Sequence, residues 1–152
     1  MRLTSFTDYG LRALMRLAGE PDRLFTTEEI ARELAISRNH LVKIVRKLAL
    51  AGIVATRKGA GGGFRLARPA GEITLGEVVR ELESGQALVE CFRSDGGACV
   101  LTPGCRFEPR LRAAREAFLR ELDRSTLSEC AWRPQGGRSL APVPLKSRRR
   151  LG

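Results

Sequence analysis

Residues 26–68 read TTEEIARELAISRNHLVKIVRKLALAGIVATRKGAGGGFRLAR, and this stretch decides the fold. Thr26 and Glu29 have the spacing of a capping box, in which each residue satisfies a free backbone N–H at the start of a helix. The apolar residues that follow at helical spacing predict a short helix that stops near Ala35.

A second helix is expected directly after it. Ile36 is expected to serve as the turn, and Ser37 is placed to cap the new helix. The apolar residues of this helix share one face and are Leu41, Ile44, Val45 and Leu48. Two short helices joined by a tight turn form a helix-turn-helix.

The opposite face of the second helix is polar and basic. Directly opposite the apolar face lie Asn39, Lys43 and Arg46, and to one side lie His40 and Lys47. The expected base or phosphate contacts of this helix are Arg38 at its start, Asn39, His40, Lys43 and Arg46. Such side chains donate hydrogen bonds to base edges and phosphates, although a charged helical face taken alone is more often simply solvated. Because His40 is the only histidine, an imidazole base would have to sit on this helix, which argues against an enzyme.

Two basic strands are predicted next, at residues 53–57 and 64–68, joined by the glycine-rich segment KGAGGG. This hairpin would serve as a wing, with Arg57, Lys58 and Arg65 as further DNA contacts. A phosphate-binding nucleotide loop is disfavoured, because Phe64 occupies its third glycine position and no Lys-Ser/Thr pair follows. The pattern therefore predicts a winged helix-turn-helix domain.

Charge is distributed unevenly along the 152 residues, which carry a formal net charge of +10. Residues 1–68 carry +7, residues 69–132 carry −3 and residues 133–152 carry +6. A basic block followed by an acidic one is expected when one part binds nucleic acid and another contacts protein. The last segment lacks apolar periodicity and is predicted to be a solvated tail. No apolar run reaches the roughly 18 residues of a membrane span, and the N-terminus lacks secretory features, so we expect a cytoplasmic protein without membrane contact.

Helices are also predicted on both sides of the winged region. One covers Phe6 to Ala18, and Thr74 and Glu77 form a second capping box ahead of another. A long helix is expected from Phe107 to about Arg124. Its narrow apolar stripe consists of Phe107, Leu111, Ala114, Phe118 and Leu122, with Leu119 beside it. The stripe suits a homodimer contact, because palindromic DNA requires two-fold proteins; the alternative is packing against its own domain.

Three cysteines, Cys91, Cys99 and Cys105, lie in the loop before the long helix with C-x7-C-x5-C spacing. In a reducing compartment such cysteines are metal ligands or redox groups more often than disulfides. Zinc sites usually pair cysteines two to four residues apart, whereas iron-sulfur clusters accept wider spacings. The spacing therefore favours a cluster, with zinc and free or redox-active thiols as alternatives. Cys130 lies beyond the helix and is a weaker candidate.

Four stretches together resemble the iron-sulfur winged-helix regulators of bacteria, most closely their nitric-oxide-sensing repressors of the NsrR type. They are MRLTSFTDYGLRALMRLA, SRNHLVKIVRKLALAGIV, GAGGGFRLARPAGEITLGEVVRELE and CFRSDGGACVLTPGC. The resemblance covers about residues 1–130 and excludes the tail. It implies a homodimer with two winged domains, a crossing pair of long helices and one cluster per protomer.

The resemblance also assigns ligands, since Cys91, Cys99 and Cys105 stand at the family's cluster positions. Cluster-biogenesis members of the IscR type have a histidine three residues after the last cysteine, where this chain has Glu108. In the nitric-oxide sensors the fourth ligand is an acidic residue of the partner's first helix, and Asp8 stands at that position. The fallback candidates are Glu108 and Cys130. A [4Fe-4S] cluster is favoured over [2Fe-2S], although three cysteines and one carboxylate can hold either.

We therefore expect a mainly α-helical protein with a small β-hairpin wing, acting as a dimeric repressor of palindromic operator DNA. Nitric oxide would be its signal, and nitrosylation would release the operator. The main alternative is a regulator of the same family that senses cluster supply, iron or redox state; an electron-transfer protein and a metal-free scaffold are further alternatives. The expected layout is a DNA-binding domain (1–83), a cysteine loop (84–106), a dimerisation helix with a short terminal helix (107–132) and a basic disordered tail (133–152).

Overall fold

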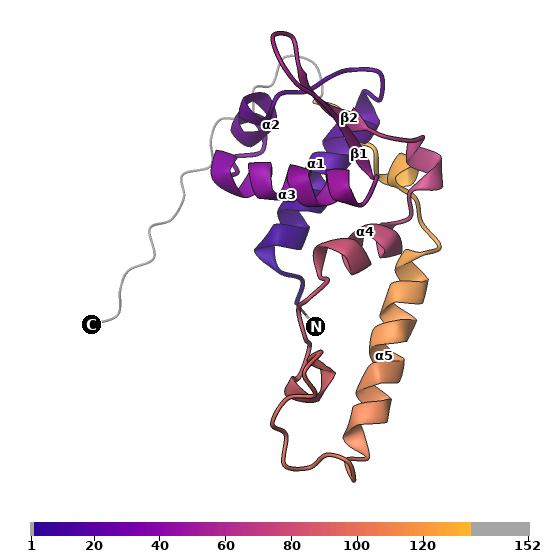
Figure 1. Ribbon diagram of the computed structural model, residues 1–152. Helices are drawn as coiled ribbons and strands as arrows, with labels where there is room; N and C mark the ends of the chain where they lie inside the picture. The colour runs from indigo at the N-terminus through magenta and orange to yellow at the C-terminus, as the bar shows by residue number, and fades with distance from the viewer. Residues whose placement is uncertain (1, 135–152) are drawn as a thin grey trace, which may run out of the picture.

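The structure, a computed structural model, describes residues 2–134 and is mostly helical with one two-stranded sheet (Figure 1). Its elements are α1 (Ser5–Gly19), α2 (Thr27–Glu33), α3 (Arg38–Leu50), β1 (Val54–Arg57), β2 (Gly63–Leu66), η1 (Ala70–Glu72), α4 (Leu75–Leu82), η2 (Glu90–Phe92), α5 (Phe107–Leu122) and η3 (Leu127–Cys130). The predicted fold class is confirmed. Residues 135–152, most of the predicted tail, lie outside the described part. No helix of that part is long and apolar enough to cross a membrane.

Helix α1 lies at the centre of the packed core. It contacts α3, α4, β2 and η3, and its residues Ala13, Leu14 and Leu17 are almost completely buried. Figure 1 shows α1 passing behind α3, with the hairpin above and α4 below. Each fully buried leucine contributes roughly 1.5–3 kcal/mol. The apolar stripe of α1 therefore holds the DNA-binding half together.

The turn between α2 and α3 differs in detail from the prediction. Ala35 makes the turn, with a φ of 53° in the left-handed region, while Ile36 is buried in the core. Ile36 can point inward because the chain has already reversed one residue earlier. Ser37 does occupy the N-cap position of α3, but its side chain makes no capping hydrogen bond.

Both predicted capping boxes form only their first half. Thr26 and Thr74 accept hydrogen bonds from backbone N–H groups three residues later. The Glu77 carboxylate turns to Arg68 instead of back to the helix start, and the Glu29 carboxylate likewise pairs with an arginine. Charge-assisted hydrogen bonds are stronger than neutral ones, so the ion pairs prevail over the second capping bond.

The wing is an antiparallel hairpin of β1 and β2, with Val54 opposite Leu66 and Arg57 opposite Gly63. Phe25, in the segment before α2, forms an isolated bridge with Phe64 of β2. Both backbone groups of that pair are used, with N···O distances of 2.9 and 2.8 Å. This third partial strand fixes the base of the wing to the helix-turn-helix.

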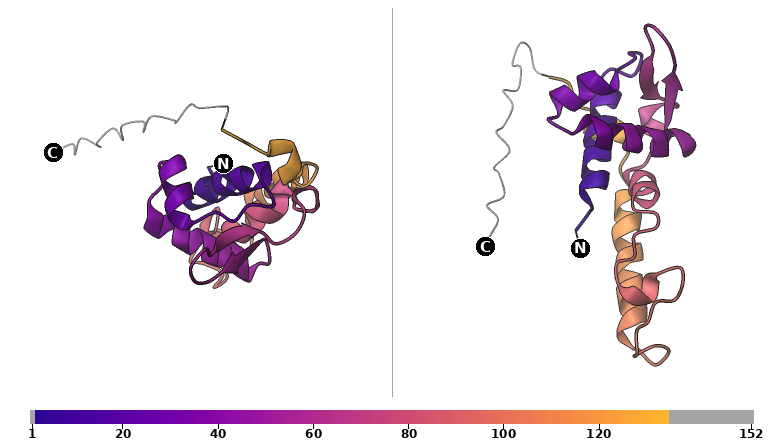
Figure 2. Two further views of the ribbon diagram at one scale, coloured as in Figure 1. Left: turned by 90° about the horizontal axis from the view of Figure 1, so that it is seen from above. Right: turned by 60° about the vertical axis from the view of Figure 1, so that its left-hand side comes forward.

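The cysteine loop and most of α5 extend away from this core, as the right-hand view of Figure 2 shows. The chain leaves α4, runs through the cysteine loop and returns along α5 to η3, which packs on α1 and η1. Backbone hydrogen bonds then join Leu127 to Ile73 and Trp132 to Met15. Arg133, the first residue of the predicted tail, donates to the Gly19 carbonyl oxygen. The end of the described chain is thus fastened to α1.

Helix α5 approaches α4 closely at Gly76. A Cβ atom at Gly76 would lie 2.8 Å from the Leu119 carbonyl oxygen and would overlap the Asp123 carboxylate. The same carboxylate binds Arg80 of α4 through two hydrogen bonds of 2.6 and 2.5 Å. The absence of a side chain at position 76 therefore lets this ion pair and the helix contact form together.

We predict that Gly76→Ala lowers the free energy of unfolding. Overpacking costs about 1–3 kcal/mol, which exceeds the roughly 0.5–1 kcal/mol that alanine gains over glycine inside a helix. Urea unfolding at fixed protein concentration measures the change. Gly71→Ala is the matched control, because its Cβ would meet only Ser128 Oγ at 3.7 Å. Equal stability of the two variants would contradict the close approach.

Candidate functional site

The outward face of α3 is built as predicted. Leu41, Ile44, Val45 and Leu48 are buried, which turns Arg38, Asn39, His40, Lys43 and Arg46 to solvent. Arg38 lies 3.3 Å from a Glu28 carboxylate oxygen, and both side chains are exposed. The His40 ring lies beside Tyr9 of α1, with 6.4 Å between the ring centroids.

The wing adds three exposed cations, Arg57, Lys58 and Arg65. Of the eight predicted DNA contacts, only Arg38 has a carboxylate partner within residues 2–134. The other cations are therefore available to phosphates without first breaking an ion pair. Helix, turn and basic hairpin together form a surface suited to the major groove and the flanking backbone of DNA.

Lys47 does not join this surface. Its ammonium donates hydrogen bonds to the carbonyl oxygens of Leu82 and Ser84, each at 3.3 Å. It also lies 5.8 Å from the centroid of the Phe6 ring. The helical wheel of α3 could not reveal this role, because it depends on where α4 ends.

The cysteine loop has little apolar packing of its own. Cys91, Cys99 and Cys105 are free thiols of intermediate exposure, while Val100 and Leu101 are 93% and 65% exposed. Between residues 2 and 134, no three histidine, cysteine or acidic side chains are grouped closely enough to hold a metal ion. The three thiols lie in one loop but are not close enough to one another to bind a common metal ion.

The predicted acidic ligands are engaged in ion pairs within the chain. Asp8 accepts two hydrogen bonds from Arg12, at 3.1 and 2.7 Å, on the exposed side of α1. Glu108 accepts one from Arg112 at 2.5 Å. Cys130 belongs to η3, beyond the 16-residue helix α5, and at 1.5 Å per residue that helix spans about 24 Å. Cys130 is thus remote from the other three thiols within one protomer.

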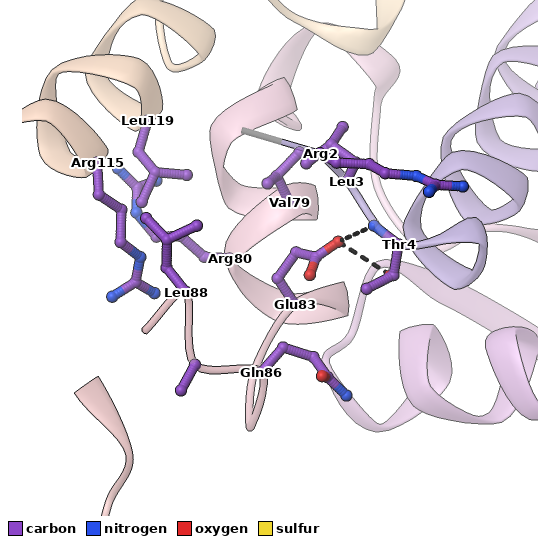
Figure 3. Close-up of a pocket in the computed structure, with 11 residues that line it drawn as sticks. Arg2, Leu3, Thr4, Val79, Arg80, Glu83, Gln86, Leu88, Arg115 and Leu119 are labelled. Atoms are coloured by element: carbon purple, nitrogen blue, oxygen red, sulfur yellow. Dashed lines mark hydrogen bonds between the residues drawn. The ribbon is translucent and has the colours of Figure 1, made fainter. Parts of the chain in front are cut away.

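The start of α1 meets the end of α4 through Glu83, a contact that the sequence did not indicate. One Glu83 carboxylate oxygen accepts hydrogen bonds from the Thr4 backbone N–H at 2.8 Å and from the Thr4 hydroxyl at 3.0 Å (Figure 3). Burial alone would raise the pKa of Glu83. Hydrogen bonds from Thr7 and Thr4, together with the Lys47 charge, instead hold its pKa below the ordinary value. Glu83 therefore remains a carboxylate.

Glu83 also borders a cavity of about 310 Å³ between the chain start, α4 and α5. In Figure 3 the side chains of Val79, Leu88 and Leu119 line one part of this space, and the guanidinium of Arg115 lies near Leu88. The cavity lies directly beside the segment that leads into the cysteine loop.

Comparison with known proteins identifies the family. Residues 3–131 match the Rrf2 family, described as an iron-dependent transcriptional regulator. The chain belongs to the Rrf2 family. It is therefore a transcriptional regulator and not an enzyme, and regulators of this family bind DNA and act as dimers.

Solved structures of similar proteins agree with this fold. CymR, the global cysteine regulator of B. subtilis, is 28% identical with a TM-score of 0.68 over 86% of this chain and 96% of its own. The oxidized form of Staphylococcus aureus CymR is 27% identical, with a TM-score of 0.65 over 89% and 99%. IscR of T. potens is similar in fold, at 23% identity and a TM-score of 0.66 over 90% and 94%.

The surface of α5 in this Rrf2 protein leaves room for a second protomer. Leu119, which lies beside the predicted stripe, is 5% exposed against its own domain, whereas Phe107 of the stripe is 65% exposed. Leu111 and Phe118 are half-buried and Ala114 is exposed. Phe107 and Ala114 are thus exposed, while Leu111, Phe118 and Leu122 are partly covered within the chain, and the use of the stripe between protomers stays a prediction.

We predict that Lys43→Ala weakens operator binding and reduces its dependence on salt. Each lost phosphate contact should lower the slope of log K against log salt by about 0.9. Fluorescence anisotropy titrations from low to physiological salt measure both quantities. Arg124→Ala, just beyond the end of α5, removes the same charge outside the DNA-binding surface and serves as the control. An unchanged slope for Lys43→Ala would show that Lys43 does not contact a DNA phosphate.

Proposed function

We propose that this Rrf2 regulator is a repressor whose cysteine loop holds an iron-sulfur cluster that senses nitric oxide. The observation that carries the proposal is the placement of three free thiols in one exposed loop between the DNA-binding core and α5. The match to an iron-dependent family supports it, as does the resemblance to nitric-oxide sensors noted above.

The chemistry of the donor set fits such a cluster. Cys91, Cys99 and Cys105 are soft sulfur ligands, which iron-sulfur clusters require, and none is buried or in a disulfide. Val100 and Leu101 between them are largely exposed, so few core contacts oppose closing of the loop. When bound, the cluster would supply iron that reacts with nitric oxide. Binding would have to draw the three thiols together and so order the loop.

Asp8 is proposed as the fourth ligand, donated to the cluster of the partner protomer. Within its own chain Asp8 is only paired with Arg12, and both side chains are about half exposed. An exposed i,i+4 pair contributes only about 0.3–0.5 kcal/mol, so the carboxylate is released easily. A carboxylate is a harder ligand than a thiolate, which suits a position that a signal must displace.

The chain's own residues would then convert the signal into a change of spacing. Asp8 lies on α1, which packs directly on the recognition helix α3. A tie between Asp8 and the partner's loop therefore restrains the separation of the two reading heads. A ligand shifts such an equilibrium only by binding the two states differently, so release of Asp8 must disfavour the spacing that matches the operator.

A thiol-based redox switch is a second candidate, favoured by the present arrangement of the cysteines. The described side chains include no group of three that is placed to hold a metal ion, and all four cysteines are free and partly exposed. Partly exposed thiols are the ones open to oxidation. Visible absorbance, iron and sulfide after anaerobic purification distinguish the two functions.

We predict that Cys91→Ser, Cys99→Ser and Cys105→Ser each lose bound iron and sulfide after anaerobic purification. Cys130→Ser should retain both, because α5 separates Cys130 from the loop. Iron and sulfide assays per protomer, with circular dichroism to check folding, make the measurement. Full occupancy in the Cys91→Ser protein would refute the ligand assignment.

Asp8→Ala should assemble a cluster on three thiolates that shows altered absorbance and resonance Raman spectra. Its operator affinity should fall, because the tie between α1 and the partner's loop is lost. Arg12→Ala is the matched control, since it breaks the same ion pair while keeping the carboxylate. Unchanged spectra and unchanged nitric-oxide-dependent release of DNA in Asp8→Ala would show that Asp8 is not the fourth ligand of the cluster.

A further inference from the structure

Lys47 of α3 turns toward α4 and away from the DNA-binding surface. It is half-buried, and its ammonium is shared by two carbonyl oxygens at the end of α4, those of Leu82 and Ser84. A lysine at a helix C-terminus satisfies free carbonyl groups and interacts favourably with the helix dipole. The recognition helix thereby caps α4 with its own side chain.

The same point is held from the α1 side. Thr4, the N-cap residue of α1, binds Glu83 through its backbone N–H and its hydroxyl, and the Phe6 ring lies under the Lys47 ammonium. Lys47 is also one of the groups that keep the pKa of Glu83 low. One polar cluster, formed by Thr4, Lys47 and Glu83, therefore joins the start of α1, the recognition helix and the end of α4.

This polar cluster lies where the cysteine loop begins. Ser84, whose carbonyl oxygen Lys47 binds, is the first residue of the segment 84–106. Its N–H bonds to the Glu81 carbonyl oxygen, and the Gln86 N–H bonds to that of Glu83. Residues 84–86 would transmit a movement of the loop to the end of α4 and from there to the Lys47 side chain.

We propose that Lys47 is a positioning residue that couples the cysteine loop to the recognition helix. It acts by capping α4 rather than by binding a phosphate. The proposal rests on the proposed sensory role of the loop, but the contact itself exists in the chain without any cofactor. Coupling free energies between sites are reciprocal, so operator binding at α3 must alter the stability of the loop start.

The test compares two variants that each remove one positive charge. Lys47→Met keeps the aliphatic stem against Phe6 and removes the cap. Arg124→Met removes an exposed charge outside the DNA-binding surface, and within residues 2–134 that side chain bonds only to Glu121. Hydrogen exchange of the Ser84 and Gln86 amides is followed in the full-length dimer, free and with saturating operator DNA, because exchange reports local opening.

In the wild-type protein and in Arg124→Met, operator binding should slow exchange at these two amides by at least about 5-fold, the lower range of allosteric coupling. In Lys47→Met the slowing should disappear, and Lys47→Arg should restore it. Retention of the full slowing in Lys47→Met, or its absence in the wild type, would overturn the proposal. If Lys47→Met does not fold, Lys47→Gln is measured instead, and the slowing should again disappear. Iron content and nitric-oxide response are measured separately, so failure of the sensory proposal is recognised independently.

Discussion

The DNA-binding half depends on one buried charge, the guanidinium of Arg16 in α1, which is 1% exposed. Its Nε donates to Glu33 of α2 at 2.7 Å, its Nη1 lies 2.8 Å from Glu20, and its plane covers the Phe25 ring at 4.6 Å. Phe25 in turn pairs with Phe64 of the wing. The guanidinium is buried while the Glu20 and Glu33 side chains are 35% and 27% exposed, so loss of a carboxylate would leave a desolvated charge without its partner. Within the apolar core, Arg16 thus links α1 to α2 and, through Phe25, to the wing.

The recognition helix is thus fixed from two directions that differ in strength. Arg16 and the apolar core hold the helix-turn-helix against α1 through contacts that exclude water. At the other end, Lys47 reaches α4 through two hydrogen bonds of 3.3 Å that are partly open to solvent, and longer bonds are weaker. Val78 and Leu82 of α4 are buried in the same core as α3, so the Lys47 contact adds a partly solvent-exposed polar link to an apolar one. Under the proposed coupling, this polar link is the part that a signal from the cysteine loop changes.

Much of the fold was predictable because it rests on local patterns. The apolar spacing of Leu41, Ile44 and Leu48 defines α3 and its outward face without knowledge of any neighbour. Two kinds of feature escaped prediction. Ala35 rather than Ile36 makes the turn, because burial of Ile36 depends on packing. Arg16, Lys47 and Glu83 acquire their roles from partners between 17 and 79 residues away, which no periodicity encodes. The three cysteines were singled out by their spacing as well as by the resemblance, whereas Asp8 was assigned by the resemblance alone.

The narrow attachment of α5 determines how two protomers can communicate. Within the described chain α5 packs mainly on α4, through Leu119, the close approach at Gly76 and the pair of Arg80 with Asp123. The stripe around Phe107, at the end next to the cysteine loop, stays largely uncovered. A partner that covers this end of α5 therefore bears on the loop and on α4 before it reaches the DNA-binding core. Because a two-fold dimer presents the same contact twice, a change at each α4 would act on both recognition helices.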